Sequence, residues 1–202
     1  MRKTYSIHAK TKNRKKMIME SALACFTKIG FNETTMADIC EDSRASVGSL
    51  YHHFKSKDNL AAAIYLEGIK DYQSCLLGKI ENEHDACRGI SGIIGAHLTW
   101  VDENPDWARF LFHQRHSQFL LGTDREISAL NRNFAVAITA WLTSQVEKGA
   151  IKKLSWDVVI PILLGPCQEY SRLYLSGKSV SNIQNAIKAL SGAAWEALKK
   201  DK

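Results

Sequence analysis

The chain has 202 residues and carries 27 Lys and Arg against 21 Asp and Glu, which gives a formal net charge of +6 at pH 7. Its hydrophobic content of 45% is enough to fill a buried core, which excludes disorder of the whole chain. The longest mainly apolar stretch, residues 158–167, is interrupted by Pro161 and Gly165 and is far shorter than the roughly 20 residues that span a bilayer.

The predicted elements begin with a basic segment. Residues 1–16 carry 7 basic side chains and no acidic ones, whereas residues 17–60 carry 4 basic against 6 acidic side chains. This segment can supply sequence-independent attraction to phosphates, as an arm that enters the minor groove of DNA. A solvated, disordered tail is the alternative, and it is the better interpretation for Arg2 and Lys3 taken individually.

The first helix is indicated by apolar residues at helical spacing. Ile18, Ala22, Phe26 and Ile29 form one stripe, which predicts a helix that buries a single face. The charged residues beside this stripe remain available to solvent or DNA. Gly30 follows the stripe and ends the helix.

Two short helices joined by a tight turn are predicted next. Thr35 suits an N-cap with Asp38 three residues later, and Ser46 can cap the second helix in the same way. Leu50 and Phe54 are four residues apart, so they lie on one face of that helix against the first helix. This arrangement is the helix-turn-helix, whose second helix is proportioned to enter the DNA major groove. The outer face of the second helix is therefore the candidate DNA reader.

Many positions of this segment agree in one register: Arg14, Ala22, Phe26, Gly30, Phe31, Thr34, Thr35, Ile39, Ser46, Gly48, Leu50, Tyr51, His53, Phe54, Lys57 and Leu60. In that register, residues 14–60 resemble the N-terminal domain of tetracycline-repressor-type (TetR) regulators. One position departs from the family pattern, because Arg44 stands in the turn where the family usually has Gly. Arg44 must either take a left-handed conformation at a steric cost or reshape the turn.

The resemblance also implies roles for individual residues. Thr35, Tyr51 and Lys57 match family positions that contact phosphates. Val47, Ser49 and His52 match positions that face base edges, and Val47 can touch a thymine methyl but cannot read a donor or acceptor. For His53, two interpretations are equally favoured: it contacts a phosphate, or it covers the core at Phe54. The candidate DNA-binding residues are Lys12, Arg14, Thr35, Arg44, Ser46, Val47, Gly48, Ser49, Tyr51, His52, His53 and Lys57.

Beyond residue 60 the pattern stays helical, without period-2 runs bounded by hairpin turns. Ser56 can cap a helix that runs to about residue 77. Later helices are predicted over residues 85–104, from Pro105 to about 121, from 123 or 124 to 149, from 155 to 176, and from Ser179 or Ser181 to about 200. We therefore expect an all-α protein of about nine helices. Residues 1–60 form an N-terminal three-helix helix-turn-helix DNA-binding domain with a basic arm, and residues 61–202 form a larger ligand-binding and dimerisation domain.

The last two helices are the dimer candidates, because their apolar surface exceeds what one face against the body requires. By resemblance, such helices pair across a two-fold axis as a four-helix bundle. Ordinary packing inside one protomer is the alternative interpretation. The dimerisation candidates are Ile160, Leu163, Leu164, Cys167, Tyr174, Ile187, Leu190 and Ala194.

An aromatic and imidazole-rich set suggests a mostly apolar pocket in the C-terminal domain. By resemblance, a small molecule binds there and moves the helix that links the two domains. Taken singly, each aromatic side chain is more often a core residue than a ligand contact. Two His three residues apart without a further partner make a poor metal site, so no metal is assigned. The ligand-binding candidates are His97, Trp100, Phe110, His113, His116, Trp141 and Tyr170.

The five cysteines are scattered without a C-x-x-C pair, which favours reduced thiols in a cytoplasmic protein. No apolar run follows the basic N-terminus, so we expect no signal peptide, and no cofactor.

The expected function is a ligand-responsive transcriptional regulator that binds a palindromic double-stranded DNA operator as a homodimer. The first hypothesis is a repressor that leaves its operator when a small-molecule effector binds. The alternative is a regulator that activates transcription or that has lost ligand control. An enzyme that uses the C-terminal cavity is the remote one, because the sequence has no G-x-S-x-G, phosphate-binding glycine loop or zinc spacing.

Overall fold

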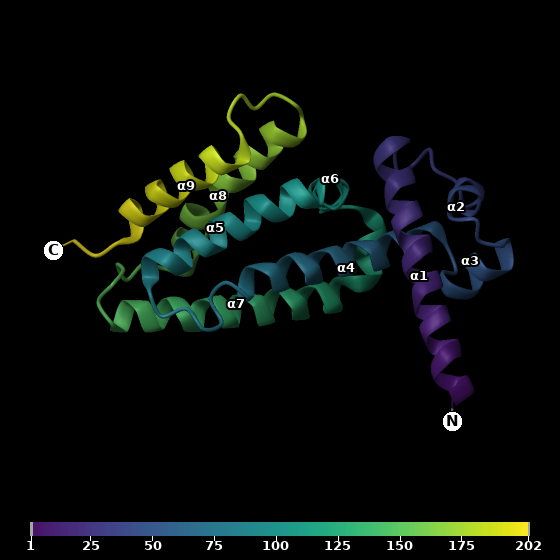
Figure 1. Cartoon of the computed structure of the whole chain (residues 1–202), viewed down its shortest axis with the longest axis horizontal. Helices are drawn as coiled ribbons and strands as arrows, with labels where there is room; N and C mark the ends of the chain where they lie inside the picture. Colours follow the sequence, from purple (N-terminus) through teal and green to yellow (C-terminus); the bar gives the residue numbers. More distant parts are fainter. Residues whose placement is uncertain (1, 202) are drawn as a thin grey trace. The chain divides into compact units, whose positions relative to one another are not determined.

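The computed structural model of the chain describes residues 2–201, and side chains from residue 13 onward. This part of the chain contains nine α-helices, one 3₁₀ helix and no strand (Figure 1). The elements are α1 (Arg2–Lys28), α2 (Met36–Ser43), α3 (Val47–His53), α4 (Lys57–Leu77), α5 (Ala86–Glu103), α6 (Pro105–His113), η1 (Gln118–Thr123), α7 (Asp124–Glu147), α8 (Trp156–Leu175) and α9 (Ile183–Leu198). The all-α prediction is therefore confirmed. No helix in the described residues is long and apolar enough to cross a membrane.

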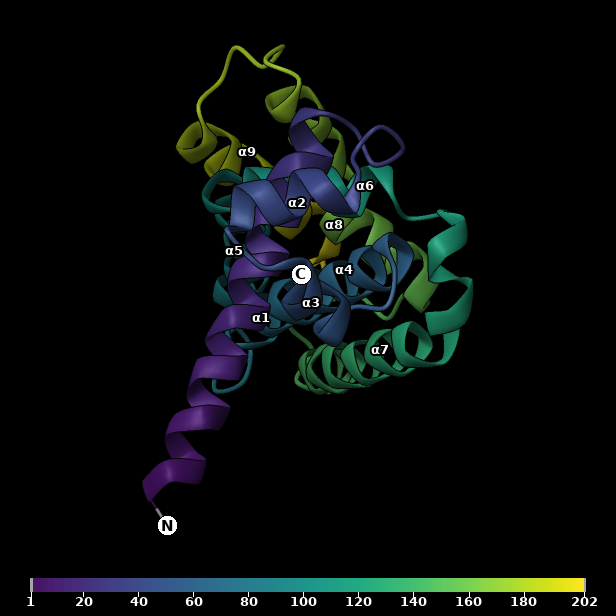
Figure 2. The same cartoon turned by 90° about the vertical axis from the view of Figure 1, so that its right-hand side faces the viewer.

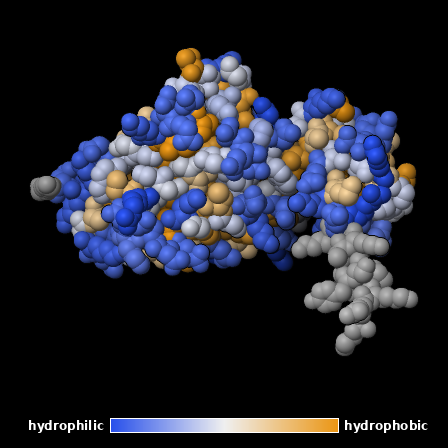
Figure 3. All heavy atoms as spheres, in the orientation of Figure 1, coloured by the Kyte–Doolittle hydropathy of each residue, from blue (hydrophilic) through white to orange (hydrophobic). Residues whose placement is uncertain are grey.

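The chain divides into two compact units, which we call the head and the body. The head consists of residues 1–68 and 106–127, and the body consists of residues 69–105 and 128–202. Helix α4 contributes its first half to the head and its last turns to the body. The head thus includes α6 and η1, which sequence analysis assigned to the C-terminal domain. Figure 3 shows hydrophilic residues over most of the visible face of each unit.

In the head, α1 packs against α2, and α2 packs against α3 (Figure 2). Ile18, Ala22 and Phe26 are buried as predicted, and they form the inner face of α1. Ile29, in contrast, is 47% exposed, because α1 ends at Lys28 and the chain turns there. The backbone at Gly30 has a φ of 105°, a conformation that a residue without Cβ adopts at little cost.

The basic segment differs from the expected arm. Residues 2–16 form the first half of α1, which continues past α2 and α3 in both views (Figures 1 and 2). No Gly or Pro occurs between residues 2 and 28, so nothing in the sequence interrupts the helix once it has formed. The side chains of Arg2, Lys3, Lys10 and Lys12 lie outside the described residues.

Two predicted helix boundaries were wrong. The helix that begins at Pro105 ends at His113 and is followed by a turn and the short η1, rather than continuing to residue 121. The last helix is capped by Asn182, whose side chain accepts a hydrogen bond from the backbone N–H of Asn185. Neither Ser179 nor Ser181 caps it, because the helix begins only at residue 183.

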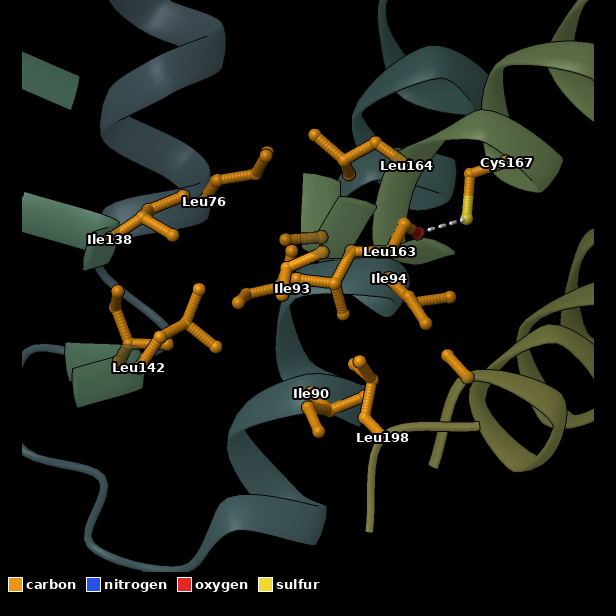
Figure 4. Packing of buried hydrophobic residues seen from close by; sticks show 14 of the residues in the cluster. Leu76, Ile90, Ile93, Ile94, Ile138, Leu142, Leu163, Leu164, Cys167 and Leu198 are labelled. Carbon is orange, nitrogen blue, oxygen red and sulfur yellow. Dashed lines mark hydrogen bonds between the residues drawn. The ribbon is translucent and has the colours of Figure 1, made fainter. Parts of the chain in front are cut away.

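The body is built around α5, which packs against α8 and α9. Ile90, Ile93 and Ile94 of α5 are fully buried and meet aliphatic side chains from α4, α7, α8 and α9 (Figure 4). Cys167 lies in the same core, where its thiol donates to the carbonyl of Leu163 at 3.3 Å. Burial raises the pKa of this thiol to about 11, as befits a small apolar residue rather than a reactive one. All five cysteines are free thiols.

The packing between α5 and α7 gives a test of the body core. A Cβ at Gly89 would overlap the ring of Trp141, whose Nε1 donates to the carbonyl of Glu83 at 2.8 Å. Gly89→Ala should therefore lower the free energy of unfolding by about 1–3 kcal/mol, measured by urea denaturation. Gly95→Ala on the same helix is the matched control, because its Cβ would lie 3.8 Å from Ile187, an ordinary contact.

Gly95→Ala should instead raise the free energy of unfolding by about 0.5–1 kcal/mol, since Ala is the better helix former. Equal stability of the two variants would contradict this description of the core.

Candidate nucleic-acid interface

Helix α2 begins at a complete capping box. The side chain of Thr35 accepts from the backbone N–H of Asp38 at 3.2 Å, and Asp38 accepts from the backbone N–H of Thr35 at 2.7 Å. Asp38 also accepts from the Thr35 hydroxyl at 2.8 Å. These hydrogen bonds, led by the one from the Thr35 backbone, lower the pKa of the Asp38 carboxyl. The cap fixes the start of the helix and keeps Thr35 at the surface.

The turn between α2 and α3 contains a left-handed residue. Arg44 has φ 50° and ψ 31°, and its backbone N–H caps α2 by donating to the carbonyls of Cys40 and Glu41. The guanidinium of Arg14 on α1 donates to the Arg44 carbonyl at 2.8 Å. Of the two outcomes expected for Arg44, the left-handed conformation is the one observed. Arg14 thus holds the strained turn from the neighbouring helix.

Helix α3 presents one continuous outer face. Ser46 caps it, as predicted, by accepting from the backbone N–H of Ser49 at 3.2 Å. Leu50 is fully buried, whereas Val47 is 61% exposed and Tyr51 is 48% exposed. Gly48 and His52 are also exposed, whereas Ser49 is half-buried. Residues 47, 48, 51 and 52 recur at helical spacing, so they form a single surface that can approach a groove.

The end of this helix meets basic residues of α1. His53 is half-buried, with its ring centroid 6.3 Å from that of Phe54 and 5.3 Å from that of His52. The ammonium of Lys15 lies 5.7 Å from the centroid of Phe54. Burial, followed by the nearby positive charges of His52, Lys15 and Arg14, lowers the pKa of His53. His53 therefore covers Phe54 and lies within a positively charged surface, and the two roles weighed for it are compatible.

Lys57 has a contact set that sequence analysis missed. Its ammonium donates to the backbone carbonyls of Phe31, Asn32 and Thr34 at 2.7, 3.1 and 2.9 Å. It also lies 4.6 Å from the centroid of the Phe31 ring. All three N–H groups of the ammonium are thereby used within the head. A sequence signal existed, because a Lys in the first turn of a helix is unfavourable to the helix dipole unless something else holds it.

In the body, two of the expected ligand residues belong to satisfied polar networks. His97 is almost fully buried, and its ring nitrogens lie 2.8 Å from the Tyr72 hydroxyl and 3.1 Å from the Ser171 hydroxyl. Ser171 donates to the carbonyl of Cys167, so Nε2 of His97 donates to Ser171 and Nδ1 accepts from Tyr72. Trp100 donates to Asp71 at 2.7 Å.

The remaining ligand candidates lie elsewhere. Trp141 is buried against α5, and Tyr170 donates to the carbonyl of Ser181 at 2.8 Å. Phe110 belongs to the head, where its ring stacks on those of Phe26 and Phe119 at 5.8 and 6.2 Å. His113 and His116 are exposed in the head. The structure thus distributes the seven candidates over both units.

A cleft that sequence analysis did not anticipate lies in the head. Its volume is about 610 Å³, and it is open to solvent. The residues that line it are Phe31, Asn32, Glu33, Asp58, Gln114, Ser117, Gln118, Phe119 and Leu121. These belong to the α1–α2 loop, the first turn of α4 and the segment after α6. Within the described residues, no group of three His, Cys, Asp or Glu side chains is placed to hold a metal ion.

The dimer candidates differ in exposure. Leu163, Leu164, Cys167 and Ala194 are buried and pack against helices of the same protomer. Ile160, Tyr174, Ile187 and Leu190 are half-buried at the edge of that core. Trp156 and Val158 on α8 are 37% and 42% exposed, although neither is among the dimerisation candidates. A contact surface on α8 and α9 must therefore use the half-buried and exposed residues.

The left-handed turn gives a second prediction. Arg44→Gly should raise the free energy of unfolding by up to about 1 kcal/mol, because glycine adopts positive φ without the Cβ clash. Arg44→Ala is the control, since it removes the same charge and keeps the strained backbone. Thermal denaturation of both variants separates the two causes. Equal stabilisation by Ala and Gly would show that the charge, not the backbone, is responsible.

The buried His97 gives a third prediction. Burial lowers its pKa from 6.5 to about 4, so the unfolded chain takes up a proton at a higher pH than the folded chain does. The stability that neutral His97 contributes is therefore fully present above pH 6.5 and is lost as the pH falls toward 4. The loss should be about 3 kcal/mol.

Urea denaturation at pH 7 and pH 4.5 measures this loss, and His97→Gln should show a smaller decrease than the native chain. His84→Gln, at an exposed position of the body, is the control. An identical decrease in the native chain and in His97→Gln would exclude His97 as the source.

Sequence comparisons agree with this geometry. Residues 18–64 match a family model described as bacterial regulatory proteins, tetR family. The HTH-type transcriptional regulator LuxR of Vibrio harveyi is 25% identical over 142 residues, which cover 68% of this chain and 67% of that protein. The HTH-type transcriptional regulator QacR of Staphylococcus aureus is 46% identical over 48 residues, which cover 24% of this chain and 26% of that protein.

The fold is shared with solved structures of the same class. A TetR family transcription regulator from Marinobacter aquaeolei superposes with a TM-score of 0.81 at 18% identity, covering 96% of this chain and 100% of that one. The segment with the family match contains the capping box, the turn and the outer face of α3. Residues 18–64 thus form a DNA-binding domain of the tetR type, and the comparisons support a DNA-binding transcriptional regulator.

Proposed function

We propose that this regulator binds a palindromic operator as a homodimer, represses transcription by occupying it, and releases it when a small-molecule effector binds. The observation that carries the proposal is the exposed outer face of α3, residues 47, 48, 51 and 52, on a helix fixed by caps at both ends. A helix in this position has the size and the surface to enter the major groove.

The roles of the head residues follow from their exposure. Val47 and His52 face outward and are proposed to meet base edges, with Val47 against a thymine methyl. Tyr51 and Thr35 carry exposed hydroxyls that suit phosphate oxygens. The guanidinium of Arg14 donates to the Arg44 carbonyl, so only its other N–H groups would be available for a contact with DNA. Ser46, Gly48, Ser49 and His53 complete the proposed surface, together with Lys12.

A dimer is proposed for a physical reason. One seven-residue helix contacts few base pairs, and two copies about one helical turn of DNA apart multiply the specificity. The half-buried residues Ile160, Ile187 and Leu190 with the exposed Trp156 and Val158 supply apolar surface on α8 and α9. We propose that these helices form the contact between protomers.

Ligand control has a competing alternative. His97, Trp100 and Trp141 have hydrogen-bond partners within the body, which is the arrangement of core residues. This observation favours the alternative of a regulator without ligand control. A small-molecule screen for operator release separates the two readings. We propose the cytoplasm as the location, because an operator must be within reach.

Selection of bound duplexes from a random pool tests the proposed function directly. The expected result is one short palindrome, whose half-sites are spaced by about one helical turn, bound far more tightly than random DNA. A pool without enrichment would contradict the proposal.

Substitution on the outer face of α3 gives a fourth prediction. Val47→Gln should change the preferred base at one position of each half-site, because an amide reads a donor and acceptor where a methyl cannot. The melting temperature should remain nearly unchanged, since the side chain is 61% exposed. Val136→Gln on α7, where Val136 is 64% exposed, is the matched control and should keep the original preference. An unchanged preference in Val47→Gln would remove this residue from the reading face.

A further inference from the structure

Lys57 lies at the junction of two elements that are distant in sequence. It is the first residue of α4, and its ammonium lies among three backbone carbonyls of the loop between α1 and α2. The Phe31 ring covers the same ammonium at 4.6 Å from its centroid. Each hydrogen bond from a charged donor is stronger than a neutral one, and a cation over an aromatic ring adds further attraction.

The loop that Lys57 contacts leads directly into α2. Thr34 is buried, and its hydroxyl lies 2.7 Å from the Gly30 carbonyl and 3.3 Å from the Cys25 carbonyl, so it joins the loop to the end of α1. The next residue is Thr35, the N-cap of α2. Whatever fixes the Thr34 carbonyl therefore fixes the point at which α2 begins.

Neither the charge nor the position of Lys57 is explained by the helix to which it belongs. The first turn of α4 is the positive end of the helix dipole, which disfavours an ammonium, and Ser56 caps it by accepting from the backbone N–H of Asn59 at 3.1 Å. The side chain is half-buried and folds back onto the loop. Lys55, two residues earlier, is exposed, and no hydrogen bond or ion pair of its side chain occurs within the described residues.

We propose that Lys57 is a positioning residue for DNA binding, which fastens the start of α4 to the start of α2 through the Phe31, Asn32 and Thr34 carbonyls. We call this contact set the Lys57 clasp. It acts on the operator through the placement of α2 and α3, and not through a phosphate contact of its own. The clasp rests on the proposed DNA-binding role of the head, and it gives α4 a direct mechanical connection to the helix-turn-helix.

The native protein gives the first test. Amine acylation, read by mass spectrometry of peptides, reports how accessible each lysine is. Lys57 should react slowly in the free protein, because its N–H groups are bonded, whereas Lys55 should react quickly. Fast acylation of Lys57 in the free protein, with protection only when duplex DNA is added, would overturn the clasp and indicate a phosphate contact.

Variants give the second test. Lys57→Met keeps the length of the apolar stem and removes the donors, and Lys55→Ala removes the same charge nearby without touching the loop. Lys57→Met should weaken operator binding about tenfold, the size of one lost charge-assisted hydrogen bond. For this variant, the slope of log affinity against log salt concentration should equal that of the native protein. Loss of a phosphate contact would instead flatten that slope by about 0.9.

Hydrogen exchange of the free protein distinguishes failure of the clasp from failure of the proposed function. In Lys57→Met, the amides of residues 31–39 should exchange faster than in the native chain, and in Lys55→Ala they should not. Faster exchange together with no operator binding by the native protein would refute the DNA role and leave the clasp intact. Unchanged exchange together with a flattened salt slope would refute the clasp.

Discussion

A helix of seven residues does not persist on its own, because a first helical turn costs more conformational entropy than its few hydrogen bonds return. The reading surface of this regulator depends on that constraint. Leu50 is the only residue of α3 that is fully buried, so packing alone holds the helix weakly. The remaining support comes from its ends, through the Ser46 cap, the left-handed Arg44 and the buried Phe54 that follows.

This support divides the polar side chains of the head into two groups. Thr35, Arg14 and Lys57 are bonded to the protein's own backbone, and they determine where α2 and α3 lie. On the outer face of α3, in contrast, the side chains of Val47 and His52 are exposed, so they remain available to a partner. In the proposed complex, affinity for DNA in general and choice of sequence therefore depend on different residues. The same separation would allow a basic α1 to serve a helix-turn-helix with few positive charges of its own.

The sequence predicted those features that are set by local chemistry. The capping box at Thr35, the Ser46 cap, and the burial of Ile18, Leu50 and Phe54 follow from hydrogen-bonding groups and helical spacing within a few residues. Long-range partners could not be predicted in this way. The three carbonyls that hold Lys57 are 23 to 26 residues away, and His97 meets a hydroxyl 74 residues away. The helix after Pro105 was predicted too long; it ends at His113, and the chain then turns so that Phe119 stacks on Phe110 of the same helix at 6.2 Å between ring centroids.

The central claim is that the outer face of α3 meets DNA while the ends of the helix hold it in place. Amide NMR spectra of the isotope-labelled protein, recorded with and without a selected duplex, test it most directly. The largest chemical-shift changes are expected at residues 44–53 and at the start of α2, with α8 and α9 nearly unaffected. Chemical-shift changes that are absent from α3 and that map to another face would contradict the claim.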